Sequence, residues 1–117
     1  VAKLNYLEDQ NIRNIKKIDV HYKTDEVFLL LKGKAVLIAV VFENEIPVFE
    51  TELMEQNKIY NIPKNMWHNI AMEEGSEVLL VEKSNTHLSD FDYYKLDSKH
   101  IITLRDQVEQ LLKNKTN

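Results

Sequence analysis

Seven short apolar runs follow one another between residues 18 and 81, and each is bounded by turn-forming or charged residues. The runs are rich in β-branched, aromatic and aliphatic side chains, which favour strands. They cover Ile18–His21, Val27–Leu31, Ala35–Phe42, Pro47–Leu53, Lys58–Ile62, Trp67–Met72 and Val78–Val81. Some could instead form a buried helix, but runs of about 4–8 residues favour strands. The series is typical of an all-β sandwich or barrel.

Three of these runs, VFLLL, AVLIAVVF and VLLV, do not alternate between apolar and polar residues. A strand with one solvated face should alternate, so both faces of these strands are expected to be covered. The interior of a barrel covers one face, and a subunit interface or a packed helix covers the other. We therefore expect a homodimer. Lys32 and Gly33 separate two of the runs and predict a tight hairpin turn, because glycine tolerates positive φ.

The two ends of the chain differ from its middle. Residues 1–17 are polar with scattered apolar side chains, and we interpret them as a weakly determined lead-in to a barrel over about residues 12–96. Near the other end, Thr103–Asp106 resembles a capping box. Leu104, Val108, Leu111 and Leu112 then form one stripe of a helix over about residues 103–115, predicted as a lid or brace on the barrel. The 117 residues fit one domain.

Composition excludes several classes of function. The net charge is −4, with acids and bases interleaved, so no basic stripe is available for nucleic acid. The chain has no cysteine, which excludes disulfides, thiolate metal sites and a cysteine nucleophile. The longest apolar stretch, 35–42, is far too short to span a membrane, and the N-terminal residues do not resemble a signal peptide. A cytoplasmic location is expected.

Histidines and carboxylates in two separated segments form the candidate site. Asp19 and His21 are two apart on a predicted strand, so their side chains share a face. Glu26 follows after a short polar turn, with Asp25 beside it as a rival that points to the opposite face. His68 begins another apolar run, five residues after Pro63. His87 and His100 lie in polar surroundings and are expected at the surface.

These residues resemble the two motifs of the cupin superfamily, G(X)5HXH(X)3-4E(X)6G and G(X)5PXG(X)2H(X)3N. His21, Glu26 and Gly33 match the second His, the Glu and the closing Gly of the first motif. Pro63 and His68 match the Pro and His of the second. The resemblance covers residues 19–72 and implies a small single-domain cupin, whose fold is a double-stranded β-helix or jelly-roll barrel.

The sequence departs from the family pattern at five positions. Asp19 stands where the family has its first His, Arg13 and Met72 replace an opening Gly and a final Asn, and Asn57 and Asn65 replace the two glycines of the second motif. Asparagine enters the left-handed region more readily than most residues, so the last two replacements keep the turns possible.

The resemblance implies that His21, Glu26 and His68 hold a divalent metal ion inside the barrel. Two His and one carboxylate suit Fe(II), and the same ligands accept Mn, Co, Ni or Zn. Asp19 would make the set more anionic if it also ligates. Phe28, Tyr60 and Trp67 are candidates for a substrate pocket beside the ion, although large aromatic side chains more often belong to a core.

The leading functional hypothesis is a metal-dependent enzyme acting on a small molecule, with isomerase-like or oxygenase-like chemistry. The alternative is a non-catalytic cupin module that binds or senses a small ligand without turnover. A third reading is a structural dimeric barrel whose site has decayed. Neither nucleic acid nor a membrane is an expected partner. The sequence identifies neither the substrate nor the metal, and it names no catalytic residue.

Overall fold

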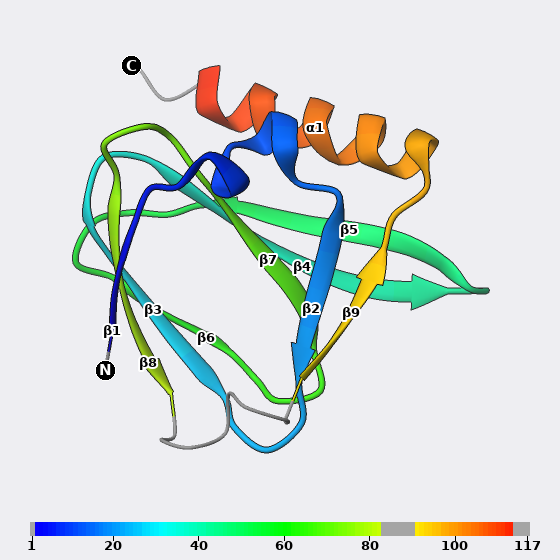
Figure 1. Cartoon of the computed structure of the whole chain (residues 1–117), viewed down its shortest axis with the longest axis horizontal. Coiled ribbons are helices and arrows are strands. Elements are labelled where there is room, and N and C mark those ends of the chain that lie inside the picture. The colour runs from blue at the N-terminus through cyan, green and yellow to red at the C-terminus, as the bar shows by residue number, and fades with distance from the viewer. Residues whose placement is uncertain (1, 83–90, 114–117) are drawn as a thin grey trace.

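The computed structural model describes residues 2–82 and 91–113, which form two antiparallel sheets and one C-terminal helix (Figure 1). The order of the four-stranded sheet is β1-β8-β3-β6, and that of the five-stranded sheet is β5-β4-β7-β2-β9. The strands are β1 (Ala2–Asn5), β2 (Lys17–His21), β3 (Glu26–Lys32), β4 (Ala35–Glu43), β5 (Ile46–Leu53), β6 (Ile59–Ile62), β7 (Trp67–Met72), β8 (Glu77–Glu82) and β9 (Phe91–Lys95). Two short 3-10 helices, η1 (Glu8–Gln10) and η2 (Ile12–Asn14), precede β2, and α1 (Ser98–Lys113) ends the described chain.

All seven predicted strands are confirmed, with boundaries that differ by a residue or two. Consecutive strands repeatedly change sheet: β2 and β4 belong to the five-stranded sheet, whereas β3 and β6 belong to the four-stranded one. These crossings are typical of a jelly roll. They place the ends of strands from both sheets at the same edge of the barrel, and this arrangement positions the candidate site.

Two apolar cores explain why the apolar run of β4 does not alternate. One lies between the sheets and includes Leu37 of β4 and Leu30 of β3. The other lies between the five-stranded sheet and α1, and includes Ile38 of β4 and Leu104 and Val108 of α1. Both faces of β4 are therefore buried, and a helix covers the outer one. The prediction of a helical brace is confirmed.

Two strands were missed by the sequence interpretation. β1 pairs with β8 through four residues, from Ala2 opposite Leu80 to Asn5 opposite Glu77, so strand structure begins before residue 12 and the lead-in reading of residues 1–17 is wrong. β9 pairs with β2 along its whole length, although all five of its side chains are exposed. Both are edge strands with little apolar periodicity, so hydrophobic pattern alone does not reveal them.

The helix begins at Ser98, five residues before the predicted start. Thr103 is not a cap: it lies inside the helix, and its hydroxyl donates to the carbonyl oxygen of Lys99 at 3.1 Å. The first turn is instead closed by the carbonyl of Asp97, which accepts from the amides of His100 and Ile101. Residues 114 and 115 of the predicted helix lie outside the described residues.

Tight turns occur at residues with positive φ, and one predicted turn, at Gly33, differs from the prediction. Gly33 has a φ of 84° but does not form a hairpin, because β3 and β4 belong to different sheets. The hairpin joins β4 to β5 through Asn44 and Glu45, both with positive φ. Asn57 and Asn65 adopt φ of 65° and 71°, as predicted for residues that replace glycines. None of the helices in the described part of the chain is long and apolar enough to cross a membrane.

Candidate metal centre

His21, Glu26 and His68 come from three strands and converge at one edge of the barrel. His21 ends β2, and Glu26 begins β3 after the chain crosses from the five-stranded to the four-stranded sheet. The turn before β7 is held against this crossing: the amide of Asn65 donates to the carbonyl of His21 at 2.7 Å, and the amide of Lys64 donates to Asp25 Oδ1 at 2.8 Å. The two motif segments are thus bonded to each other, which brings His68 beside Glu26.

The carboxylate of Glu26 lies between the two imidazoles. Glu26 Oε1 is 2.7 Å from His68 Nε2, and Glu26 Oε2 is 3.1 Å from His21 Nε2. One ligand atom from each of the three residues lies within 4.8 Å of the other two. Glu26 and His68 are buried, and His21 is half-buried. The predicted convergence of the three side chains is therefore present.

These separations fit a common metal ion. Metal–ligand bonds of about 2.1 Å at right angles place neighbouring ligand atoms about 3.0 Å apart. Each imidazole nitrogen faces its own oxygen of Glu26, at 2.7 Å for His68 and 3.1 Å for His21, and both distances are close to that value. The donor set of two imidazoles and one carboxylate is one that Fe(II) and related divalent ions accept.

The orientation of His68 is fixed by the backbone. Its Nδ1 lies 2.9 Å from the carbonyl oxygen of Met66, so Nδ1 carries a proton and Nε2 faces Glu26. Desolvation lowers the pKa of His68, but the hydrogen bonds to Glu26 and Met66 outweigh it, so that this pKa lies above its ordinary value. Desolvation raises the pKa of Glu26, and the hydrogen bonds from His68 and Glu82 bring it below its ordinary value. Without a metal, both shifts of pKa favour the charged forms of the pair.

Glu82 is a site residue that the sequence interpretation missed. It ends β8 directly opposite Glu26, and the two side chains share a hydrogen bond. Desolvation and this hydrogen bond raise the pKa of Glu82 to about 7. Its Oε1 is buried and has no hydrogen-bond partner among the described residues. The only signal in the sequence is a carboxylate directly after an apolar run, and nothing there indicates its partner.

Asp19 is adjacent to the three ligands but is not grouped with them. It is the cross-strand partner of His68, so it faces the space between the sheets, on the same face as His21 as predicted. Its Oδ1 lies 3.8 Å from Lys17 Nζ. Desolvation raises the pKa of Asp19 above its ordinary value. The group of side chains with metal-ligand spacing contains His21, Glu26 and His68 without Asp19.

The three predicted pocket aromatics occupy different places. Phe28 is buried between the sheets, and its ring contacts that of His68 edge-on at 6.3 Å. Tyr60 belongs to the same core, and its hydroxyl accepts from the amide of Glu55. Trp67 does not line the site: it packs on the helix side of the sheet with Phe42 and Tyr94. The correction follows from strand alternation, since Trp67 and His68 are consecutive and point to opposite faces.

The structure also places Asp25, the alternative to Glu26 as a ligand, and His100, which was expected at the surface. Asp25 caps the turn at Lys64 and does not join the ligands. His100 is half-buried near Asp97, with 3.9 Å between its Nδ1 and the carboxylate. His87 lies outside the described residues.

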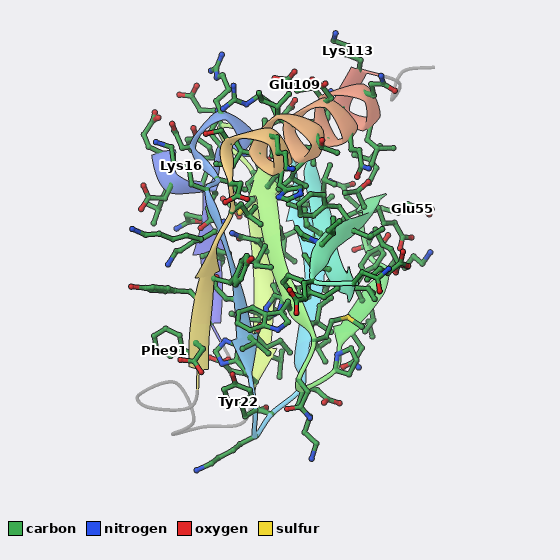
Figure 2. The ribbon with its side chains drawn as sticks, turned by 90° about the vertical axis from the view of Figure 1, so that its right-hand side faces the viewer. Lys16, Tyr22, Glu55, Phe91, Glu109 and Lys113 are labelled. Carbon is green, nitrogen blue, oxygen red and sulfur yellow. The ribbon has the colours of Figure 1, made fainter. Side chains whose placement is uncertain are left out.

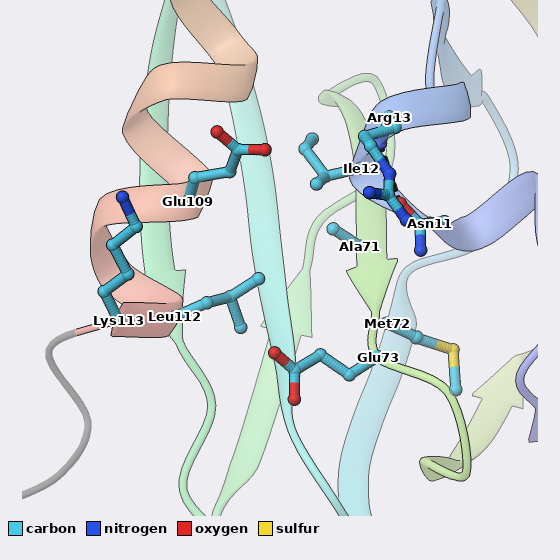
Figure 3. Close-up of a pocket in the computed structure, with 9 residues that line it drawn as sticks. All are labelled: Asn11, Ile12, Arg13, Ala71, Met72, Glu73, Glu109, Leu112 and Lys113. Carbon is cyan, nitrogen blue, oxygen red and sulfur yellow. Dashed lines mark hydrogen bonds between the residues drawn. The ribbon is translucent and has the colours of Figure 1, made fainter.

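One cavity lies beside the candidate metal centre, and another lies away from it. One of about 570 Å³ is lined by Lys16, Lys17, Lys95 and Asp19 among others, and Asp19 is the cross-strand partner of the candidate ligand His68. The other, of about 490 Å³, lies between α1 and the end of β7, where Glu109 and Leu112 of α1 lie on one side and Arg13 and Glu73 on the other (Figure 3). None of the three candidate ligands lines either cavity.

Solved structures with a similar fold are sugar ketoisomerases. A 3,4-ketoisomerase from Helicobacter canadensis matches 75% of this chain with a TM-score of 0.54 and 13% identity. A TDP-quinovose 3,4-ketoisomerase from Campylobacter jejuni matches 74% with a TM-score of 0.52 and 15% identity. The chain spans 62% of the length of each.

A third similar structure is a sugar 3,4-ketoisomerase from Thermoanaerobacterium thermosaccharolyticum in complex with TDP. The match covers 92% of this chain and 72% of that enzyme, with a TM-score of 0.53 and 15% identity. No protein-family model and no curated protein sequence matches the chain. Structural similarity at sequence identities this low establishes the fold and leaves the activity open. Two antiparallel sheets, a C-terminal helix and these structural neighbours together show that the chain has the fold of a small cupin, as its motifs predicted.

Proposed function

We propose that the protein is a metal-dependent cupin enzyme that acts on a small molecule, with a divalent ion held by His21, Glu26 and His68. The observation that supports this most directly is the pair of nitrogen–oxygen distances, 2.7 and 3.1 Å, around one buried carboxylate. Isomerase-like chemistry is favoured over oxygenase-like chemistry because the structural neighbours reported above are ketoisomerases. A bound divalent ion would polarise a carbonyl or hydroxyl oxygen at its open positions.

The side chains of this site have separate roles in the proposal. His21 and His68 supply neutral nitrogens, and Met66 holds His68 in the required orientation through its carbonyl. Because its pKa is raised to about 7, Glu82 is partly protonated near neutral pH, and its Oε1 has no partner among the described residues. It is therefore suited to exchange a proton with a bound molecule. Phe28 closes the apolar side of the site against water.

Metal content tests the proposal directly. Wild-type protein incubated with Fe(II), Mn(II), Co(II), Ni(II) or Zn(II) and then desalted should retain about one ion per chain, measured by element-resolved mass spectrometry. His68→Ala should lose it, because one of three ligands is removed. His100→Ala is the matched control, since His100 lies outside the ligand group, and it should retain the ion. Circular dichroism establishes that each variant is folded. Metal-free wild type, or unchanged content in a folded His68→Ala, would contradict the proposal.

Turnover separates an enzyme from the alternative, a binding or sensing module. The metal-loaded protein is offered a panel of sugar phosphates, keto acids and catechols, and products are followed by mass spectrometry. Conversion of a panel member that is lost in His68→Ala supports the enzyme. Saturable binding of a panel member without product supports the module.

A homodimer also remains part of the proposal, as does a cytoplasmic location. The outer face of the four-stranded sheet supports the dimer, because α1 packs on the other sheet and leaves Leu31, Ile59 and Val81 exposed. Ile59 is 71% exposed. Sedimentation should give a dimer mass that Ile59→Lys reduces to that of a monomer. A monomeric wild type at tens of micromolar would contradict the dimer.

A further inference from the structure

Strands β2 and β9 carry a row of three cross-strand pairs that leads to the candidate metal centre. Lys17 lies opposite Lys95, Asp19 opposite Tyr93, and His21 opposite Phe91. Residues that alternate along a strand share a face, and directly opposite residues share it too. The face is the one that looks into the barrel, because its member Asp19 is also the partner of His68. The row therefore runs from a lysine pair to a metal ligand.

The lysine end of the row carries a net positive charge, because three lysines line the cavity there against two aspartates. Like charges directly opposite each other in a sheet are destabilising. Lys17, Lys95 and the neighbouring Lys16 line the cavity of about 570 Å³, against the carboxylates of Asp9 and Asp19. Asp19 is already 3.8 Å from Lys17 Nζ, and within the described part of the chain Lys16 and Lys95 form no ion pair. An anion in this cavity would relieve the repulsion.

The amide side chains of the cavity are already engaged, so recognition there depends on the lysines. Gln10 donates to the carbonyl of Ile70, and Asn69 donates to the carbonyl of Lys17, each at 2.8 Å. Asn14 donates to the carbonyl of Glu8. Ammonium groups bind phosphate as point charges, and a phosphate monoester carries close to two negative charges at neutral pH. Two opposed lysines match that charge better than they match a single carboxylate.

The middle and far end of the row suit the uncharged part of a ligand. Tyr93 and Phe91 are 54% and 45% exposed, which is unusual for aromatic side chains so close to a core. Lys17 Nζ lies 4.8 Å from the ring centroid of Tyr93, and the ring of Phe91 lies 6.1 Å from that of His21. Figure 2 shows Phe91 near Tyr22 at the end of the molecule away from α1, whereas Lys16 lies near the helix. His21 lies four residues after Lys17 on β2, which is about 13 Å along the strand.

From this row we propose that the barrel binds a phosphorylated polyhydroxy compound, with its phosphate between Lys17 and Lys95 and its carbon chain or ring over Tyr93. The far end of the ligand then reaches His21, Glu26 and His68. Only this last placement rests on the proposed metal-dependent function. The phosphate position rests on the lysine pair and the cavity, and it holds whether or not the protein binds metal.

Calorimetric titration with inorganic phosphate and with a hexose phosphate tests the proposal on protein kept metal-free by chelator. Lys17→Gln and Lys95→Gln should each weaken both ligands about tenfold or more, since a hydrogen bond to a charged group is worth about 1.5–3 kcal/mol. Lys3→Gln makes the same charge change on β1, in the other sheet, and should leave both affinities unchanged. Tyr93→Ala should weaken the hexose phosphate and spare inorganic phosphate.

Three results would overturn the proposal: no saturable phosphate binding, equal losses in Lys3→Gln and the two site variants, or binding by the free sugar as tight as by its phosphate. All four substituted side chains are exposed, so the variants should fold as the wild type does. His68→Ala should keep its phosphate affinity while losing metal. Failure of the metal proposal and failure of the phosphate proposal are therefore distinguishable.

Discussion

Gly33→Ala should destabilise the protein far more than the same change at Gly75. Both glycines have positive φ, 84° and 87°, so an alanine at either position carries the same backbone strain of about 1 kcal/mol. A Cβ at Gly75 would meet nothing within 4 Å. A Cβ at Gly33 would lie within 2.8 Å of Ser76 Cα and closer still to its hydroxyl. The backbone of Ser76 must therefore move.

The magnitude follows from what Ser76 holds in place. Its side chain is buried, accepts from the amide of Lys34 at 2.9 Å and donates to the carbonyl of Lys34 at 2.8 Å. Breaking these two hydrogen bonds in a buried place costs about 1–2 kcal/mol each. Together with the strain, the free energy of unfolding should fall by about 3–5 kcal/mol for Gly33→Ala and by about 1 kcal/mol for Gly75→Ala.

Urea unfolding followed by circular dichroism measures both values, and an unchanged m-value establishes that the comparison is valid. A loss of 3–5 kcal/mol is a large part of the roughly 5–15 kcal/mol available to a domain of this size. Equal losses at the two glycines would refute the reasoning, because the contact with Ser76 is what distinguishes them.

Three further perturbations test the helix, the carboxyl pair and the metal. Leu104→Ala should lower the free energy of unfolding by about 2–5 kcal/mol, since this side chain of α1 is buried against the five-stranded sheet. Ile102→Ala, on the exposed face of α1, should change it by less than about 0.5 kcal/mol in urea unfolding. The folded pKa of Glu82, about 7, exceeds its unfolded value of 4.5, so metal-free protein should lose stability as pH rises between these values. Glu82→Gln should flatten that loss, and an unchanged pH profile would count against the Glu26–Glu82 contact. A divalent ion at 100 times its Kd should raise the free energy of unfolding by about 2.7 kcal/mol, with chelator reversing the gain. That gain should shrink as the pH falls through the raised pKa of His68, because the proton competes with the ion, and a pH-independent gain would place the ion elsewhere.

Sequence and structure agree most closely where local chemistry decides the outcome. The apolar runs predicted seven of the nine strands in the described part of the chain, and Asn57 and Asn65 take the positive φ expected of residues in glycine positions. His21, Glu26 and His68 were selected from motif spacing, and their ligand atoms converge within 4.8 Å. These successes depend on patterns carried by a few neighbouring residues.

The errors concern features that depend on distant partners. β1 and β9 have weak apolar patterns, and they are strands because β8 and β2 offer them unpaired edges. Gly33 was predicted in a hairpin because adjacent runs often pair, but the chain crosses to the other sheet there. Thr103 resembled a cap, but the helix begins five residues earlier, at Ser98. In each case tertiary packing outweighs the local signal.

The sequence by itself determined the strand-rich character, the left-handed turns and the three candidate ligands, because periodicity, conformational freedom and motif spacing are local properties. Only the tertiary structure decided that Glu82 lies opposite Glu26, that Trp67 faces away from the site, and that Lys17 and Lys95 stand side by side. Strand register sets these contacts, and register is a relation between segments far apart in the chain.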